Sequence, residues 1–507
     1  MSPDERLERR KSGRGKRRQR RVTYFFGTNV SRSYTVYDGS VWTLQRALVE
    51  RMFVSTHDTE DGSLDKPHVP GDGAVYRTLA PAFDAIAKRK KHLTPMTDQE
   101  FVSSRGRKRA AYEQALIVFR RRGWREKDSY VSFFVKAEKT YRGRRKPDPV
   151  PRVISPRSKV YNIAVGRYIA PLESVLFKVI NDMFGEVVVA KGLNASQRGE
   201  LCAQKWAAVQ EPCALGGDIH RMDQHVCVEA LEWGHDVYDL FFRSPTLRRL
   251  LLMQLENRGW GRCYDGCLRI VLEGRRMSGD MDTSLGNILM CCSVLYCIRE
   301  LVGYFSPLND GDDWIVVITR ALLPEFQRTA TATFKECGLP LGLEAPVSHV
   351  EHMDFCQARP VFDGTRWTVV RDPRICLDKD ACTLKPVRNK ADWNILRNSV
   401  GLCGLALAGH MPIYCEFYEA LRRGAGERVD KDQTPSGFKM LAKGMNMRGV
   451  KVTPEARASF WQAFGITPDE QHAVEAYYRQ LNPVWRPPAE YGGQVEGRVG
   501  LAVGSFD

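Results

Sequence analysis

The spacing of apolar and polar positions changes along the chain and divides it into regions. From about residue 205 to 375, short strand-like apolar runs alternate with segments whose apolar residues recur every three or four positions, as in amphipathic helices. From about 388 to 480 the helical spacing prevails, with breaks at Gly424–Gly426 and at the Pro435–Gly437 turn. This pattern predicts a mixed α/β (α+β) fold with a helical C-terminal region.

The N-terminal part differs because basic residues interrupt its apolar pattern. Residues 107–122 predict a basic helix, with Ala115, Leu116 and Phe119 at helical spacing. Residues 136–159 contain prolines at a density that excludes a helix. They predict a loop or edge ribbon that displays Arg and Lys. Residues 55–75, rich in Gly, Asp, Pro and Ser, predict a long loop.

The charge of the chain indicates a polyanionic partner. Its 507 residues carry 76 Lys and Arg against 60 Asp and Glu, a net charge of +16. A field of that sign attracts nucleic acid or an anionic membrane surface. Basic residues concentrate near the N-terminus, which predicts a disordered, phosphate-binding tail over residues 1–30. The Gly- and Pro-rich residues 483–507 predict a flexible C-terminal tail.

Cysteine spacing indicates a cytosolic compartment, and the apolar runs do not predict a membrane span. The 14 cysteines show no paired CxxC spacing, which favours reduced thiols over a zinc site or disulfides. The best candidate for a membrane span, Ile288–Ile298, is shorter than the ~18 residues that a span needs. It predicts a core helix instead.

Two aspartate segments carry candidate chemistry. In the first, a short apolar stretch ends at Asp218, and Asp223 follows five residues later at the start of a predicted helix. Alone, this arrangement is a weak signal, because Asp is common at strand ends and helix caps, and it favours the helix-cap interpretation. In the second, Asp310-Gly311 precedes a β-branched run, which predicts a hairpin. Its tip carries the adjacent Asp312 and Asp313, whose mutual repulsion is costly unless a cation neutralises it.

A third segment lies between the other two. Residues 277–287 follow the strand-like Leu268–Leu272 and open a long apolar helix. Thr283 and Asn287 are four residues apart and therefore share one helical face, while Gly279 allows close approach to a ligand. If the hairpin packs beside the first strand, the three aspartates offer the hard oxygen ligands that a pair of Mg²⁺ ions prefers.

The three segments resemble motifs A, B and C of viral RNA-dependent RNA polymerases. Their pattern is D-x4-D at 218–223, S-G-x3-T-x3-N at 278–287 and G-D-D at 311–313. Short segments elsewhere in the chain resemble the polymerases of the tombusvirus and umbravirus group of plus-strand RNA viruses. They are Ala137–Lys139, Pro151–Arg157, Gly166–Tyr168, Arg276–Met281, Phe355–Gln357 and Pro360–Val361. The likeness runs from roughly residue 30 to 480.

The resemblance implies a right-hand polymerase fold. It places fingers with fingertips at 31–204, a palm of antiparallel sheet flanked by helices at 205–375 with some fingers segments inserted, and a helical thumb at 376–482. It implies template-directed RNA synthesis that replicates a plus-strand RNA genome by two-metal nucleotidyl transfer. The implied cofactor is Mg²⁺, with Mn²⁺ as a substitute. The implied partners are template RNA, nascent RNA and nucleoside triphosphates, and not DNA.

The resemblance also implies residue roles. Asp218 and Asp312 would bind catalytic metal with Asp313 in support. Asp223 and Asn287, helped by Ser278 and Thr283, would recognise the ribose 2′-hydroxyl, which both donates and accepts hydrogen bonds. Four basic residues would line the nucleotide entry path and grip the triphosphate: Lys136, Lys139, Arg152 and Arg157. Another group would guide the template: Ser104, Arg105, Gly106, Arg107, Lys108 and Gly279. Phe355–Phe362 resembles motif E, the hairpin that positions the primer end.

Two features depart from the family. Gly342 stands where motif D often has a lysine, so no general acid is assigned. Close relatives carry a membrane-targeting segment ahead of this region, and this sequence shows none. We therefore expect membrane association to be indirect, through an auxiliary viral replication protein, at membrane-associated replication complexes in the host cytoplasm.

Two other functions fit parts of the sequence. A reverse transcriptase would share the aspartates, but it usually keeps a bulky residue near the ribose, whereas Asp223 and Asn287 favour ribonucleotides. A non-catalytic viral RNA-binding protein would suit the basic tail equally well, but it has no need for Asp218, Asp312 and Asp313. Activity of an Asp312→Ala variant and its RNA binding separate this last alternative from the polymerase.

Overall fold

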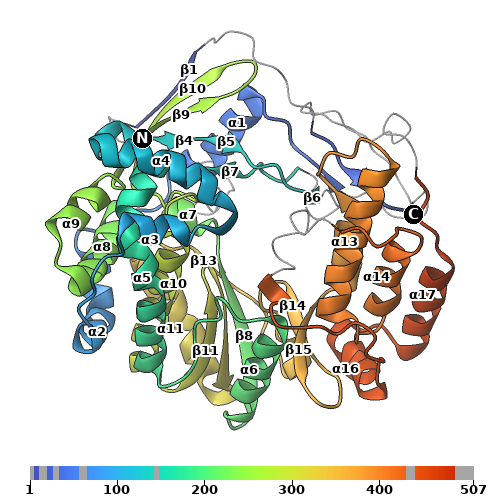
Figure 1. Ribbon diagram of the computed structural model, residues 1–507. Helices are drawn as coiled ribbons and strands as arrows, with labels where there is room; N and C mark the ends of the chain where they lie inside the picture. Colours follow the sequence, from blue (N-terminus) through green and yellow to red (C-terminus); the bar gives the residue numbers. More distant parts are fainter. Residues whose placement is uncertain are drawn as a thin grey trace.

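The computed structural model describes residues 5–10, 20–26, 34–55, 65–141, 148–429 and 440–485. A four-stranded sheet of order β11-β12-β8-β13 lies at its centre (Figure 1). Its strands are β8 (Pro212–Ile219), β11 (Phe305–Asp310), β12 (Asp313–Thr319) and β13 (Leu341–Leu343). All of its pairings are antiparallel.

Both faces of the central sheet are buried, which explains its continuous apolar runs. Trp314, Val316 and Ile318 of β12 enter the largest core, whereas the alternate Ile315 and Val317 enter a smaller core on the opposite face. The helices that contribute to the large core include α2 (Ala74–Arg89), α5 (Lys159–Phe184), α8 (Val228–Phe242), α9 (Pro245–Leu252), α10 (Thr283–Val302) and α11 (Leu323–Glu336). The smaller core includes residues of α6 (Ala195–Ala207).

Helix α10 confirms the predicted core helix. By length and composition it could cross a membrane, but 78% of its most apolar window is buried inside the fold. None of the fourteen cysteines, all of which lie in the described residues, forms a disulfide. Next to α5 lie the short α3 (Asp98–Ser103) and the predicted basic helix, α4 (Arg109–Arg122).

A second sheet has the order β1-β10-β9-β4. Its strands are β1 (Arg6–Arg10), β4 (Val131–Ser132), β9 (Glu256–Arg262) and β10 (Cys267–Glu273). Leu268, Ile270 and Leu272 of β10 pack into a core that also holds residues of α1 (Val41–Leu48). The proline-rich segment contributes short ribbons, as predicted, with β5 (Phe134–Val135) paired to β7 (Val153–Ile154) and β6 (Thr140–Tyr141) paired to β3 (Tyr34–Thr35).

A helical bundle forms the C-terminal part (Figure 1, orange to red). Its helices are α12 (Pro373–Asp380), α13 (Lys390–Ala408), α14 (Tyr414–Arg422), α16 (Pro454–Phe464) and α17 (Pro468–Gln480). The hairpin of β14 (Ala358–Phe362) and β15 (Trp367–Arg371) joins it to the central sheet region. Its turn falls at the Asp363-Gly364 pair, where Gly364 has a φ of +95°. This confirms the hairpin that the sequence predicts.

Two described parts of the predicted N-terminal tail, residues 5–10 and 20–26, pack against the rest of the fold. Where the structure describes it, Arg6–Arg10 forms the edge strand β1 against β10, with Leu7 against the apolar core. Residues 20–26 contribute β2 (Thr23–Tyr24), which pairs with β16 (Cys382–Thr383) of the C-terminal region. Phe25 and Phe26 are buried in the core of the helical bundle. The free energy gained by burying these aromatic side chains exceeds the preference of the surrounding arginines for solvent.

The first residues of the predicted C-terminal tail, 483–485, are described in the structure. The Trp485 ring packs against Trp393 with the ring centroids 5.8 Å apart, so residues 483–485 belong to the bundle. Residues 486–507 lie outside the described part of the chain, as do residues 56–64 of the predicted loop at 55–75.

Candidate active site

The central sheet brings the predicted aspartates together. In the register of β8 and β12, Asp313 lies opposite Asp218, and Asp312 precedes β12 in the turn. A Cβ on Gly217 would stand 2.1 Å from the indole of Trp314. The glycine therefore lets the two strands pack closely beside the large buried ring.

The turn before Asp312 has its own support. Gly311 adopts a φ of +94°, a conformation that favours glycine. The buried Asn309 side chain donates to the carbonyl of Gly311 at 2.8 Å and accepts from its N–H at 3.2 Å. Arg198 of α6 forms an ion pair with Asp310. The backbone N–H of Cys356 donates to Asp313 Oδ2 at 3.0 Å.

The carboxylates form a site of concentrated negative charge. Burial and the neighbouring Asp218 raise the pKa of Asp312. Burial, followed by the charge of Asp312, raises the pKa of Asp313 to about 7. The side chain of Asp218 is largely exposed, and its Oδ2 lies 3.5 Å from His220 Nδ1. A divalent cation would relieve this repulsion.

The donor set fits a divalent cation, since it consists of hard carboxylate oxygens. Within the described residues, no three His, Cys, Asp or Glu side chains are grouped so that they could hold a metal ion by themselves. Substrate oxygens would have to complete the coordination shell, as is common for Mg²⁺. The residues that could hold the ion are Asp218, Asp312 and Asp313.

Asp223 and Asn287 meet beside these aspartates. Asp223 belongs to the short helix α7 (Met222–His225), and Asn287 Nδ2 of α10 donates to Asp223 Oδ1 at 3.1 Å. Burial raises the pKa of Asp223 to about 6, although the bond from Asn287 lowers it; the charge of Asp312 raises it further. Asn287 Oδ1 is buried and has no hydrogen-bond partner in the described structure. It is an acceptor without a donor, next to a carboxylate.

The loop at 277–283 packs against the proline-rich segment. Ser278 Oγ accepts a hydrogen bond from the Ser155 N–H at 3.2 Å. A Cβ on Gly279 would meet backbone atoms of Pro156 at 2.5 Å. Thr283 Oγ1 donates to the carbonyls of Met277 at 2.8 Å and Asp280 at 3.0 Å. These residues therefore shape the loop, and their nucleotide and template roles stay predictions.

Arg157 is not placed as predicted. Its side chain is only 1% exposed and forms an ion pair with Asp280, whose side chain is 4% exposed. The guanidinium also donates to the Ser129 carbonyl and to Asn257 Oδ1. Because these buried partners occupy its donors, Arg157 cannot grip a triphosphate here. The basic pattern of the loop did not reveal the buried acceptor, which lies 123 residues away.

The other three predicted triphosphate residues differ in position. Arg152 is exposed, and its charge lowers the pKa of both Asp223 and Asp312, which places it within electrostatic reach of the site. Lys136 Nζ lies 3.0 Å from Glu138. Lys139 Nζ donates to the carbonyl of Lys379 in α12, toward the helical bundle. Arg152 also lies 3.8 Å from Glu138, the carboxylate that Lys136 contacts.

Five of the six predicted template residues, Ser104 to Lys108, lie between α3 and α4. Gly106, Arg107 and Lys108 form an exposed turn of 3₁₀ helix. The Arg105 guanidinium stacks over the Phe101 ring at 4.2 Å and donates to Ser104 Oγ at 2.9 Å. The residues form one basic surface, and its template role stays a prediction.

Two supporting residues were missed by sequence reasoning. Arg198 lies 112 residues from its partner Asp310, and no local pattern signals the pair. Asn309 could have been noticed, because Asn before Asp-Gly is typical of a side chain that closes a turn. Gly342, at the position where motif D often has a lysine, lies opposite Asp218 in the sheet.

Comparison with known proteins agrees with this geometry. The family described as viral RNA-dependent RNA polymerase matches residues 8–486. The chain is 36% identical over 474 residues to the RNA-directed RNA polymerase of Tobacco necrosis virus (strain A), covering 92% of this chain and 64% of that protein. It is 37% identical over 470 residues to the enzyme of Oat chlorotic stunt virus, covering 88% of this chain and 62% of that one.

A third relative is similar to the same extent. The RNA-directed RNA polymerase of Turnip crinkle virus is 36% identical over 480 residues, which cover 92% of this chain and 61% of that protein. The chain thus spans less than two thirds of the length of these curated relatives. Its match to the family nevertheless covers nearly the whole sequence. The chain belongs to the viral RNA-dependent RNA polymerase family.

Proposed function

We propose that this chain catalyses template-directed RNA synthesis by nucleotidyl transfer. The observation that carries the proposal is the pairing of Asp218 with Asp313, with Asp312 in the adjoining turn, beside the hydrogen-bonded Asp223 and Asn287. One group of side chains suits metal-bound phosphate, and the other suits a ribose hydroxyl. Family membership supports the same reaction.

The chain would adopt the right-hand polymerase arrangement of fingers, palm and thumb. The central sheet and its helices would form the palm, and the C-terminal bundle the thumb. The segments before residue 205, together with the β9–β10 hairpin, would form the fingers. Contacts with the C-terminal region support an arrangement in which the fingers pack against the thumb. They are made by residues 20–26, 34 and 139.

In the proposed mechanism the aspartates hold divalent metal, with Mg²⁺ as the expected ion and Mn²⁺ as a substitute. When bound, these ions would neutralise phosphate charge and lower the pKa of the attacking 3′-hydroxyl. Asn287 Oδ1 accepts a hydrogen bond from the ribose 2′-hydroxyl, and the Asp223 carboxylate fixes the orientation of the Asn287 amide. Arg152 faces the triphosphate, where its charge opposes the negative charge that develops on transfer.

The biological setting that we propose is replication of a plus-strand RNA genome in the host cytoplasm, at membrane-associated complexes. Membrane recruitment would be indirect, through an auxiliary viral replication protein. Co-purification of the chain with membranes, with and without the other replication proteins of the same virus, tests this setting.

The reaction is tested with a short RNA template, labelled nucleoside triphosphates and the purified chain. Both primer extension and primer-independent initiation are measured with Mg²⁺, with Mn²⁺ and with excess chelator. Product is expected with either ion and none with the chelator. Absence of product under all conditions, from a folded chain that still binds RNA, would favour the RNA-binding protein instead.

Sugar selection gives a prediction that separates the polymerase from a reverse transcriptase. The Asp223→Ala variant is expected to lose roughly tenfold or more of the preference for ribo- over deoxyribonucleotides. One well-placed hydrogen bond to the 2′-hydroxyl is worth about that much. Single-nucleotide incorporation of UTP and dUTP, compared as kcat/KM, measures the preference.

The matched control is Ser284→Ala. Ser284 lies on the same helix as Asn287, and its hydroxyl has no hydrogen bond in the described structure. This control should keep the selectivity of the unmodified chain. An unchanged preference in Asp223→Ala would remove Asp223 from ribose recognition, and efficient dUTP use by the unmodified chain would favour the reverse transcriptase.

A further inference from the structure

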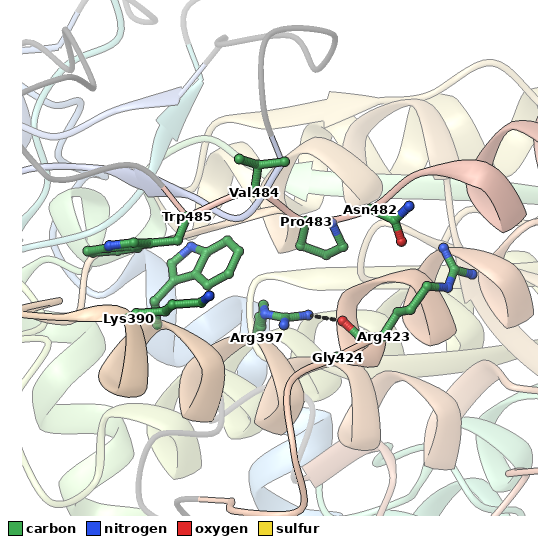
Figure 2. A pocket seen from close by; sticks show the side chains of 9 residues that line it. Lys390, Arg397, Arg423, Gly424, Asn482, Pro483, Val484 and Trp485 are labelled. Carbon is green, nitrogen blue, oxygen red and sulfur yellow. Dashed lines mark hydrogen bonds between the residues drawn. The ribbon is translucent and has the colours of Figure 1, made fainter.

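A pocket in the C-terminal bundle lies apart from the residues of the proposed active site. It has a volume of about 420 Å³, within the range of small-molecule sites, and opens between α13, the end of α14 and residues 482–485 (Figure 2). Its lining includes Lys390, Trp393, Arg397, Arg423 and Trp485. None of the predicted catalytic, nucleotide or template residues lines it.

The pocket carries positive charge without a counter-ion. Arg397 is only 3% exposed, yet its guanidinium donates only to neutral acceptors. These are Asn394 Oδ1 and the carbonyls of Leu421 and Arg423 (Figure 2 shows the last). Its pKa is lowered to about 10 by burial, with no carboxylate to raise it. A buried cation that lacks a charged partner is costly and favours binding of an anion.

Two further cations face the same space. Arg423 donates to the carbonyls of Tyr478 and Leu481, which again are neutral. Lys390 is exposed and forms no ion pair within the described structure. The lining contains no acidic residue. The nearby Asp392 is already paired with Arg388 at 2.9 Å.

Aromatic rings complete the lining. Trp393 is buried, and its indole N–H donates to the Tyr24 carbonyl at 3.3 Å, which fixes the ring. Trp485 packs against it with an interplanar angle of 56°, and Arg397 lies over the Trp393 ring at 4.7 Å. The pocket thus combines flat apolar surfaces with three cations, the features that bind bases and phosphates of single nucleotides.

We propose that this pocket is a second nucleotide-binding site. Lys390 and Arg423 hold the phosphates, the buried Arg397 supplies positive potential, and the base lies against the indole of Trp485. The same chemistry is offered by a free nucleoside triphosphate and by one nucleotide of an RNA strand. The site lies outside the proposed catalytic machinery and does not depend on it.

The test measures ATP binding by equilibrium dialysis in the presence of EDTA, so that metal-dependent binding at the aspartates is minimised. Lys390→Glu is expected to weaken ATP binding at least fivefold, and Trp485→Ala to weaken it by a similar factor. Trp485→Phe, which keeps a ring, should retain most of the affinity. The control is Lys385→Glu, an exposed lysine outside the lining, which should bind as the unmodified chain does.

Competition identifies the source of the nucleotide. A short single-stranded RNA that displaces ATP, and that binds Lys390→Glu more weakly, would assign the pocket to the RNA strand. RNA that leaves bound ATP in place would assign it to free nucleotide. Equal ATP binding by Lys390→Glu, Trp485→Ala and the control would overturn the proposal. So would inorganic tripolyphosphate that binds as tightly as ATP, since the base would then contribute nothing.

Discussion

Replacement of Asp312 by asparagine is expected to reduce RNA synthesis about 10³-fold or more, which corresponds to roughly 4 kcal/mol of transition-state stabilisation. The amide keeps the size of the side chain but removes the charge that would hold a divalent ion beside Asp218. RNA binding should persist, because the basic surfaces of the chain are unchanged. Primer extension under single-turnover conditions and filter binding of the same RNA measure the two quantities.

The melting temperature of Asp312→Asn distinguishes a loss of catalysis from a loss of the folded state. Burial and Asp218 raise the pKa of Asp312, so the charged form is disfavoured in the folded chain. The neutral amide removes that repulsion, and the melting temperature of Asp312→Asn in chelator should therefore equal or exceed that of the unmodified chain. Glu325→Gln, at an exposed pair with Arg328, is the control and should keep full activity. Undiminished synthesis by Asp312→Asn would remove the catalytic assignment.

The second large effect concerns stability. Arg157→Met is expected to lower the free energy of unfolding by about 3–5 kcal/mol, since it leaves Asp280 buried without its partner. Urea unfolding followed by tryptophan fluorescence measures the loss. The double variant Arg157→Met with Asp280→Leu should recover much of it, because apolar side chains can replace a buried ion pair without a large penalty.

Arg152→Met is the matched comparison from the same segment. Its side chain is 59% exposed, so its stability should change by no more than about 0.5 kcal/mol. The KM for nucleoside triphosphate should instead rise. If Arg157→Met remained stable and only raised the KM, Arg157 would be a triphosphate ligand after all, and its buried placement would not describe the working enzyme.

Local sequence signals located the aspartates well. The Asp-Gly turn before a β-branched run predicted the hairpin of β11 and β12, and the apolar stretch that ends at Asp218 predicted β8. Both depend on turn chemistry and side-chain alternation within about ten residues. The helical spacing of Thr283 and Asn287 was also correct, although only Asn287 reaches Asp223.

Contacts between distant segments were not predictable in the same way. Nothing in the sequence near Arg157 indicates Asp280, and nothing near Arg198 indicates Asp310. The charge run at the N-terminus was equally ambiguous, because arginines occur both in solvated tails and on edge strands. β1 pairs with β10 because backbone N–H and C=O groups of β10 are otherwise unpaired at the edge of the sheet. That edge exists only in the assembled fold, so the sequence near residues 6–10 does not reveal it.

The pairing of β2 with β16 has a consequence for biosynthesis. Tyr24 lies opposite Cys382, 358 residues later in the chain. At about 5–20 residues per second, a ribosome delivers the partner strand roughly 20–70 s after the N-terminal one. Until then Phe25 and Phe26 have no bundle core to enter, so both aromatic side chains remain outside a hydrophobic core while the 358 residues up to Cys382 are synthesised.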